Sequence, residues 1–231
     1  MVEPPIAKIE WNGGVRIIRS HYPPIDLFED IADPEDWGSL IAAEMKTNPR
    51  LVQSIGNLDL VPAARRVSGP GASFLMAPFT HASIDRPSRF SDGRFGVLYI
   101  AEGFDTAVAE TIYHHARFMA ATDQRPGWTS HFREITLDVG AGSHDIRGQG
   151  FESLMNPSDY SGPQEFGAGL RAEGSDGIVY ESVRATGDCA ALFYPDGATN
   201  ARQGRHLDYH WDGARVDLVR DLSGGDVYRV A

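Results

Sequence analysis

The stretch from Ser88 to Glu110 contains three side chains that could act on one ligand. Arg89 opens a glycine-containing turn, Tyr99 lies in the apolar run GVLYIA, and Glu110 follows in an amphipathic segment, at intervals of 10 and 11 residues. A guanidinium presents a rigid fork of N–H donors that matches phosphate or carboxylate oxygens. Singly, each residue has an ordinary structural explanation. Together, on a turn, a strand and a helix, they predict an anion clamp, an aromatic platform and a carboxylate around one cleft.

The helix expected after Asp105 separates its apolar face from its chemical face. Val108, Ile112 and Met119 form the apolar stripe, and Asp105 is a suitable N-cap. Glu110 lies two residues from Ile112, so at about 100° per residue it points away from that stripe. Tyr113 and His114 follow Glu110 by three and four residues and lie on its side of the helix.

Other polar residues are weaker candidates for the same cleft. Arg66 also precedes a glycine-containing turn, where a backbone can approach a ligand closely. Ser182 lies on one face of the expected strand DGIVYESVR. His81 and His114 are interpreted as hydrogen-bonded structural histidines, and no metal site is predicted.

Composition limits the classes of partner. The 231 residues include 21 basic and 32 acidic side chains, a formal net charge of −11, which disfavours nucleic acid as the main ligand. The 42% hydrophobic content is typical of a globular protein. No apolar run approaches the roughly 20 residues of a membrane span, and the N-terminus lacks a secretory pattern. With Cys189 as the single cysteine, we expect a cytoplasmic protein that contacts neither membrane nor nucleic acid directly.

The pattern along the chain predicts an α+β protein. Residues 1–60 are expected to form a helical N-terminal extension that packs on the core, with helices broken at Pro34 and Pro49. Residues 61–231 contain short alternating or apolar runs that predict two twisted, mainly antiparallel sheets. A tight hairpin is predicted at Asp212-Gly213.

Six short motifs occur in a fixed order along residues 61–200. They are Arg66-Val67, Gly71-Ala72, Ser88-Arg89-Phe90, Val97-Leu98-Tyr99, Thr106-Ala107-Val108-Ala109-Glu110 and Ser182-Val183-Arg184. This order resembles the RES domain, a family of toxins from bacterial toxin–antitoxin pairs. The N-terminal extension, and a longer segment in place of the usual Gly-Gly-Arg-Trp-Asn, are similar to the longer, ParT-like branch.

The resemblance implies an ADP-ribosyltransferase-like fold with an NAD cleft and NAD as the substrate. It implies that Glu110, Arg89 and Tyr99 are catalytic. NAD would be bound by Arg66, Arg89, Tyr99 and Ser182, without a metal. The bond between nicotinamide and ribose would be broken, and Glu110 would stabilise the positive charge that develops on the ribose.

The resemblance also implies partners. These are an antitoxin with a helix-turn-helix domain that blocks the active site and, for a mono-ADP-ribosyltransferase, a host metabolic protein that accepts ADP-ribose. Water or phosphate as acceptor would instead make the chain an NAD glycohydrolase or an NAD phosphorylase. A non-catalytic nucleotide-binding module is a further alternative. A glycoside hydrolase with paired carboxylates is disfavoured, because no second acid emerges as a partner for Glu110.

Overall fold

The computed structural model describes residues 3–22, 25, 27–31, 33–44, 46 and 51–230. Eight strands are described within these ranges: β1 (Ile6–Arg19), β2 (Leu98–Ala101), β3 (Trp128–Asp145), β4 (Gly177–Glu181), β5 (Asp188–Leu192), β6 (Ala198–Trp211), β7 (Val216–Asp221) and β8 (Val227–Arg229). The α-helices described there are α1 (Trp37–Glu44), α2 (Leu51–Ile55), α3 (Ala72–Thr80), α4 (Phe104–Ala120) and α5 (Ser161–Ala172). None of these helices is long and apolar enough to cross a bilayer.

The strands form one hydrogen-bonded sheet in the order β1-β2-β5-β4-β3-β6-β7-β8, with an additional β1–β3 pairing. All pairings are antiparallel except the parallel β3–β4 pairing. The α+β class and the mainly antiparallel strands are therefore confirmed. The two predicted sheets are two parts of one sheet, because the long strands β1 and β3 belong to both. The pairing of β1 with both β2 and β3 closes the first five strands into a ring.

The N-terminal region differs from the helical extension expected for residues 1–60. Residues 6–19 form β1, which pairs with β3 from Ile6 opposite His144 to Arg19 opposite Phe132. Its β-branched residues favour a strand, and long-range pairing with β3 satisfies its backbone groups. The expected helices are short (α1 and α2) and follow this strand. Pro34 lies in a turn before α1, as predicted, whereas Pro49 lies outside the described residues.

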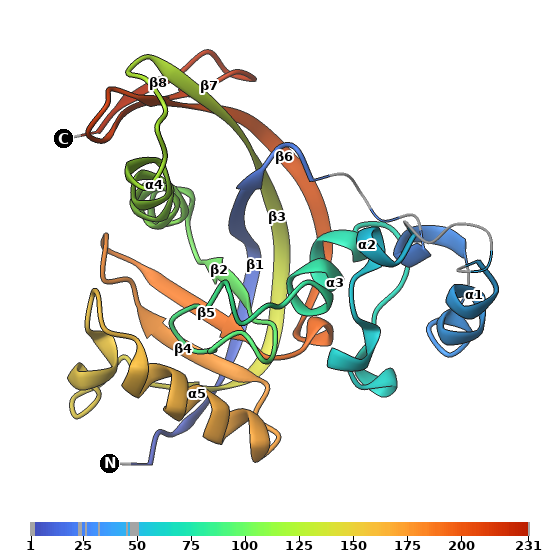
Figure 1. The fold of residues 1–231 in the computed structure, drawn as a ribbon. Helices are drawn as coiled ribbons and strands as arrows, with labels where there is room; N and C mark the ends of the chain where they lie inside the picture. Colours follow the sequence, from blue (N-terminus) through green and yellow to red (C-terminus); the bar gives the residue numbers. More distant parts are fainter. Residues whose placement is uncertain are drawn as a thin grey trace.

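The helices lie on both sides of the long strands (Figure 1). Helices α1, α2 and α3 lie on one side, and α4 and α5 lie on the other. The side chains of β2 alternate between the two sides of the sheet. Leu98 and Ile100 pack in the core cluster that contains α3, whereas Tyr99 and Ala101 pack in a second cluster with Phe90. Tyr99 therefore lies on the α4 side of the sheet.

Helix α4 confirms the predicted apolar stripe and corrects its predicted cap. Val108, Ile112 and Met119 pack in a third core cluster, against β6 and β7. The N-cap is Gly103, without a side-chain cap, and Asp105 lies in the first turn. There its carboxylate interacts favourably with the positive end of the helix dipole.

The predicted strands after residue 127 are mostly confirmed. β3 contains EITLDVG, β5 contains most of CAALFYP, and β6 and β7 are joined at Asp212-Gly213. Gly213 has φ of 105°, a conformation that glycine adopts without strain. However, β4 ends at Glu181, so Ser182 and Arg184 lie in the loop after the strand and not on its face.

The buried His115 makes the stability of this fold depend on pH. Its side chain is 5% exposed, its ring packs edge-on against Phe132, and its Nε2 has no protein partner among the described residues. Burial, with a smaller contribution from Arg19, lowers the pKa of His115 to about 4. Because the unfolded chain binds a proton more readily, acid favours unfolding.

We predict that the free energy of unfolding falls as the pH is lowered from about 6.5 to 4. The part due to His115 is about 3 kcal/mol at most, at about 1.4 kcal/mol for each pKa unit. Urea denaturation of wild type and His115→Leu at several pH values measures this contribution to the free energy of unfolding. The variant should lose less stability on acidification, and the exposed control His21→Leu should behave as wild type. Equal acid sensitivity of His115→Leu and wild type would contradict the assignment.

Candidate active site

The turn that carries Arg89 is fixed by Tyr99. The Tyr99 hydroxyl donates to Ser88 Oγ at 2.9 Å and accepts the backbone N–H of Phe90 at 2.9 Å. Gln164 of α5 donates to the Ser88 carbonyl oxygen at 2.9 Å. Burial raises the pKa of Tyr99 to about 12, so its hydroxyl keeps its proton at neutral pH. Tyr99 thus holds the residues on both sides of Arg89.

The Arg89 side chain is buried, and main-chain carbonyl groups hold it. Its Nη1 donates to the carbonyl oxygens of Leu154, at 3.1 Å, and Asn156, at 2.8 Å. The Tyr160 ring centroid lies 4.6 Å from its guanidinium carbon, which is a cation–π contact. In the described part of the chain, no carboxylate forms a salt bridge with Arg89. Within the described residues, its positive charge is therefore not neutralised by a carboxylate.

Glu110 is oriented by Ser182, which lies 72 residues further along the chain. Ser182 Oγ donates to Glu110 Oε1 at 2.6 Å. Ser182 Oγ also accepts hydrogen bonds from the backbone N–H groups of Arg184 and Ala185, at 3.1 and 3.2 Å. Because these two bonds occupy the acceptor side of the hydroxyl, its one proton is directed at the carboxylate. The side chain of Glu110 remains 22% exposed, so a ligand can reach it.

The two histidines have different surroundings. His114 Nε2 lies 3.9 Å from Glu110 Oε2. Burial lowers the pKa of His114, the positive charge of Arg184 acts in the same direction, and Glu110 opposes both. Because the ordinary pKa of histidine is about 6.5 and that of His114 is lowered, His114 is mostly uncharged at neutral pH and adds little positive charge beside Glu110. His81 contacts Thr80 Oγ1 and the Gln53 carbonyl oxygen, which confirms its structural interpretation.

Arg89 and Glu110 act electrostatically on the same neighbours. Burial raises the pKa of Cys189 to about 12; Glu110 raises it further and Arg89 opposes this. Burial also raises the pKa of Tyr180, on which Glu110 and Arg89 have the same opposing effects. Both charges thus influence the pKa values of Cys189 and Tyr180, and no salt bridge joins the two charges within the described residues. The buried Cys189 thiol stays protonated and is a poor nucleophile.

Arg66 is the one predicted site residue that the structure places elsewhere. Its Nε donates to the Val61 carbonyl oxygen and its Nη2 to the Leu58 carbonyl oxygen, both at 3.1 Å. Val61 and Leu58 belong to the core cluster that contains α3, on the other side of the sheet from Tyr99. Hydrogen bonds join Ser182 to Glu110 and Tyr99 to the residues beside Arg89, whereas Arg66 holds the chain before α3.

The sequence pattern predicted no role for the loop that contains Leu154, Asn156 and Tyr160, which contacts Arg89. The Pro157 carbonyl oxygen accepts hydrogen bonds from Tyr113 Oη, at 3.3 Å, and from Arg184 Nη2. The Arg184 guanidinium carbon lies 3.4 Å from the Tyr113 ring centroid. The position of Tyr113 beside Glu110 on the helix, and the Ser-Val-Arg motif, were available signals for these two residues. For Asn156 and Tyr160 there was none, because only the fold brings them to Arg89.

The described residues contain no group of three or more His, Cys, Asp or Glu side chains that could hold a metal ion. The arrangement presents an anion-binding guanidinium, a carboxylate with a fixed orientation and a neutral imidazole. It could bind an anionic ligand and stabilise a cation that forms beside it.

We predict that Tyr99→Phe destabilises the protein by about 1–2 kcal/mol. The substitution removes one hydroxyl that serves both Ser88 and the Phe90 N–H, and it leaves that N–H without its partner. Urea denaturation checks this, with Tyr22→Phe as the control, because Tyr22 is an exposed aromatic residue. An unchanged midpoint and slope for Tyr99→Phe would show that the turn does not depend on this hydroxyl.

This chain is similar to known proteins and to one protein family. An uncharacterised protein, y4oC, of Sinorhizobium fredii is 29% identical over 209 residues, which cover 88% of this chain and 85% of that protein. The crystal structure of the M. tuberculosis MbcT–MbcA toxin–antitoxin complex matches with a TM-score of 0.44 and 14% identity, over 88% of this chain and 87% of that chain. The family model named RES domain matches residues 63–212, which include Arg89, Tyr99, Glu110 and Ser182. Since this match spans well over half of the sequence, the chain belongs to the RES domain family.

Proposed function

We propose that this chain is an NAD-consuming toxin of a bacterial toxin–antitoxin pair. It breaks the bond between nicotinamide and ribose and transfers ADP-ribose to a protein acceptor. The observation that carries the proposal is the Glu110 carboxylate. Ser182 orients it through a hydrogen bond of 2.6 Å, and its side chain is 22% exposed, so a ligand can reach it. Membership of the RES domain family supports NAD as the substrate.

In the proposed reaction the bonding electrons leave with the nicotinamide nitrogen, which becomes neutral. This leaving group needs no acid to protonate it, so one carboxylate is sufficient. Positive charge spreads over the ribose C1 and ring oxygen, and Glu110 stabilises it. The attraction is stronger in the transition state than in the ground state, which is the condition for catalysis. The acceptor then bonds to C1 and loses its proton.

The other site residues have supporting roles in the proposal. Arg89 binds the NAD pyrophosphate, because it is a cation without a carboxylate partner in the described chain. Tyr99 holds the turn of Arg89, and Ser182 keeps one carboxylate oxygen of Glu110 in place. Both residues thus position a charge, and their hydrogen-bonding groups are already used in doing so. Arg66, expected to bind pyrophosphate, bonds instead to the carbonyl groups of Val61 and Leu58, in the core cluster on the other side of the sheet from Tyr99, so we assign the pyrophosphate to Arg89.

A protein that consumes NAD would injure the cell that makes it. We therefore propose that an antitoxin covers the site until the toxin is needed. Following the family resemblance, this partner carries a helix-turn-helix domain and binds the DNA itself. The net charge of −11 on the present chain suits this division, because such a surface repels a phosphate backbone.

We predict that Glu110→Gln slows NAD consumption about 100-fold or more, the scale for removing one electrostatic stabiliser. Glutamine keeps the size of the side chain and can still accept the Ser182 hydrogen bond, so the loss reports the charge. Nicotinamide release by purified protein measures the rate. Glu173→Gln is the matched control, because Glu173 is exposed at the end of α5. An undiminished rate for Glu110→Gln would refute the assigned role.

The acceptor is identified by incubating the protein with NAD labelled in its adenylate half, alone, with phosphate, and with a bacterial lysate. Free nicotinamide with label on a discrete protein band is the expected result. Free ADP-ribose would indicate a glycohydrolase, and its 1-phosphate a phosphorylase. Intact NAD in every sample would refute the enzymatic proposal and favour a nucleotide-binding module.

A further inference from the structure

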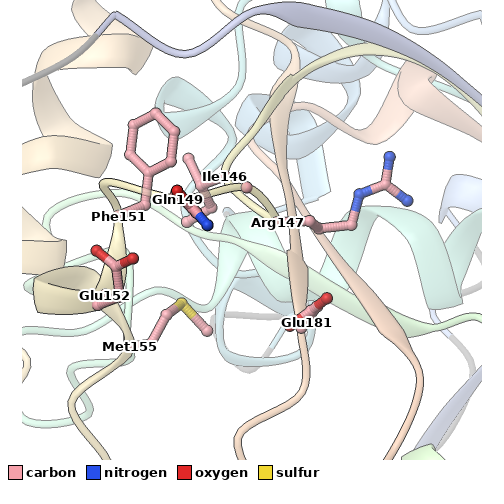
Figure 2. A pocket seen from close by; sticks show the side chains of 8 residues that line it. Ile146, Arg147, Gln149, Phe151, Glu152, Met155 and Glu181 are labelled. Carbon is pink, nitrogen blue, oxygen red and sulfur yellow. The ribbon is translucent and has the colours of Figure 1, made fainter.

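A cavity of about 350 Å³ lies beside the segment that holds Arg89 (Figure 2). Ile146, Phe151 and Met155 give it an apolar part, and the carboxylates of Glu152 and Glu181 belong to its lining. Ile146 and Phe151 are 2% and 4% exposed, whereas both glutamates are exposed. The lining therefore combines an apolar base with two solvent-facing acids.

The cavity has a net negative charge because its arginine is already neutralised. Arg147 pairs with Asp145 through Nη2, at 2.6 Å, and with Asp188 through Nη1. Both carboxylates raise the pKa of Arg147, and Asp145 has the larger effect. Among the described residues, neither Glu152 nor Glu181 forms a salt bridge with a basic side chain. Backbone N–H groups, including that of Gly150, lower the pKa of Glu152, so it is ionised at neutral pH.

We propose that this cavity is a docking pocket for an arginine or lysine side chain of a partner protein. The alkyl stem of such a side chain packs on the half-buried Met155, and its cationic end pairs with Glu152 and Glu181. The surplus of acidic groups in the lining repels phosphates, so the pocket does not serve the pyrophosphate of NAD. The net charge of −11 on the whole chain also favours the approach of a basic surface.

The position of Met155 connects the pocket to the candidate active site. Met155 lies between Leu154 and Asn156, whose carbonyl oxygens hold Arg89. A basic side chain in the pocket therefore contacts the segment that positions Arg89. A partner protein anchored there lies beside the proposed site of NAD chemistry. The binding itself requires no NAD and is independent of the proposed reaction.

The test uses the full chain labelled with ¹³C at its methionine methyl groups. The Met155 signal, assigned with Met155→Leu, reports the pocket directly. The probes are the blocked peptide Gly-Gly-Arg-Gly-Gly and the same peptide with citrulline, which replaces the guanidinium by an uncharged group of similar shape. We expect a saturable shift of the Met155 signal with the arginine peptide and at least tenfold weaker binding of the citrulline peptide.

Two double variants test the carboxylates. Glu152→Gln with Glu181→Gln should weaken binding of the arginine peptide about tenfold. Asp123→Asn with Asp226→Asn removes the same charge from exposed positions after α4 and before β8, and should bind as wild type. The proposal is overturned by equal binding of the two peptides, by an unmoved Met155 signal, or by equal affinities of the two double variants. Nicotinamide release is measured separately, so failure here leaves the proposed reaction untouched.

Discussion

The hydrogen bond from Ser182 to Glu110 is the interaction on which the candidate site depends, because it joins two parts of the chain that only the fold brings together. Glu110 lies on α4, and Ser182 lies in the loop that connects β4 to β5. That loop sits against the start of α4, where Thr106 donates to the Thr186 carbonyl oxygen at 2.9 Å. At Gly187, with φ of 129°, a Cβ atom would lie 2.4 Å from Thr106 Oγ1. Only glycine permits this approach, so the loop and the helix are matched closely where the carboxylate is set.

The second constraint is that the site keeps opposite charges apart. A buried arginine usually pairs with a carboxylate. Here Arg89 is stabilised by the carbonyl dipoles of Leu154 and Asn156 and by the ring of Tyr160. A direct pair with Glu110 would neutralise both groups. Holding them separately leaves a cation for an anionic ligand and a carboxylate for a developing positive charge.

The segment from Leu154 to Tyr160 thus does two things at once. Its carbonyl groups position Arg89, and contacts from Tyr113 and Arg184 to Pro157 hold it against α4. Met155, in the same segment, lines the acidic cavity. A ligand of Arg89 and a ligand of this cavity would both lie close to the same short piece of main chain.

Features that depend on local periodicity and on residue type follow from the amino-acid sequence alone. The apolar stripe of α4, the alternation of β3 and the hairpin at Asp212-Gly213 follow from neighbouring residues, and so does the placing of Glu110 away from the core. The ordered motifs identified the family, which the match over residues 63–212 confirmed.

The groups that each side chain contacts depend on the fold of the whole chain. Residues 6–19 form a strand because β3 is there to pair with them, and Arg66 turns to the carbonyl groups of Leu58 and Val61. Hydrogen-bond partners 65 to 72 residues apart, such as Arg89 with Leu154 and Glu110 with Ser182, leave no local pattern, because only the folded chain brings them within bonding distance.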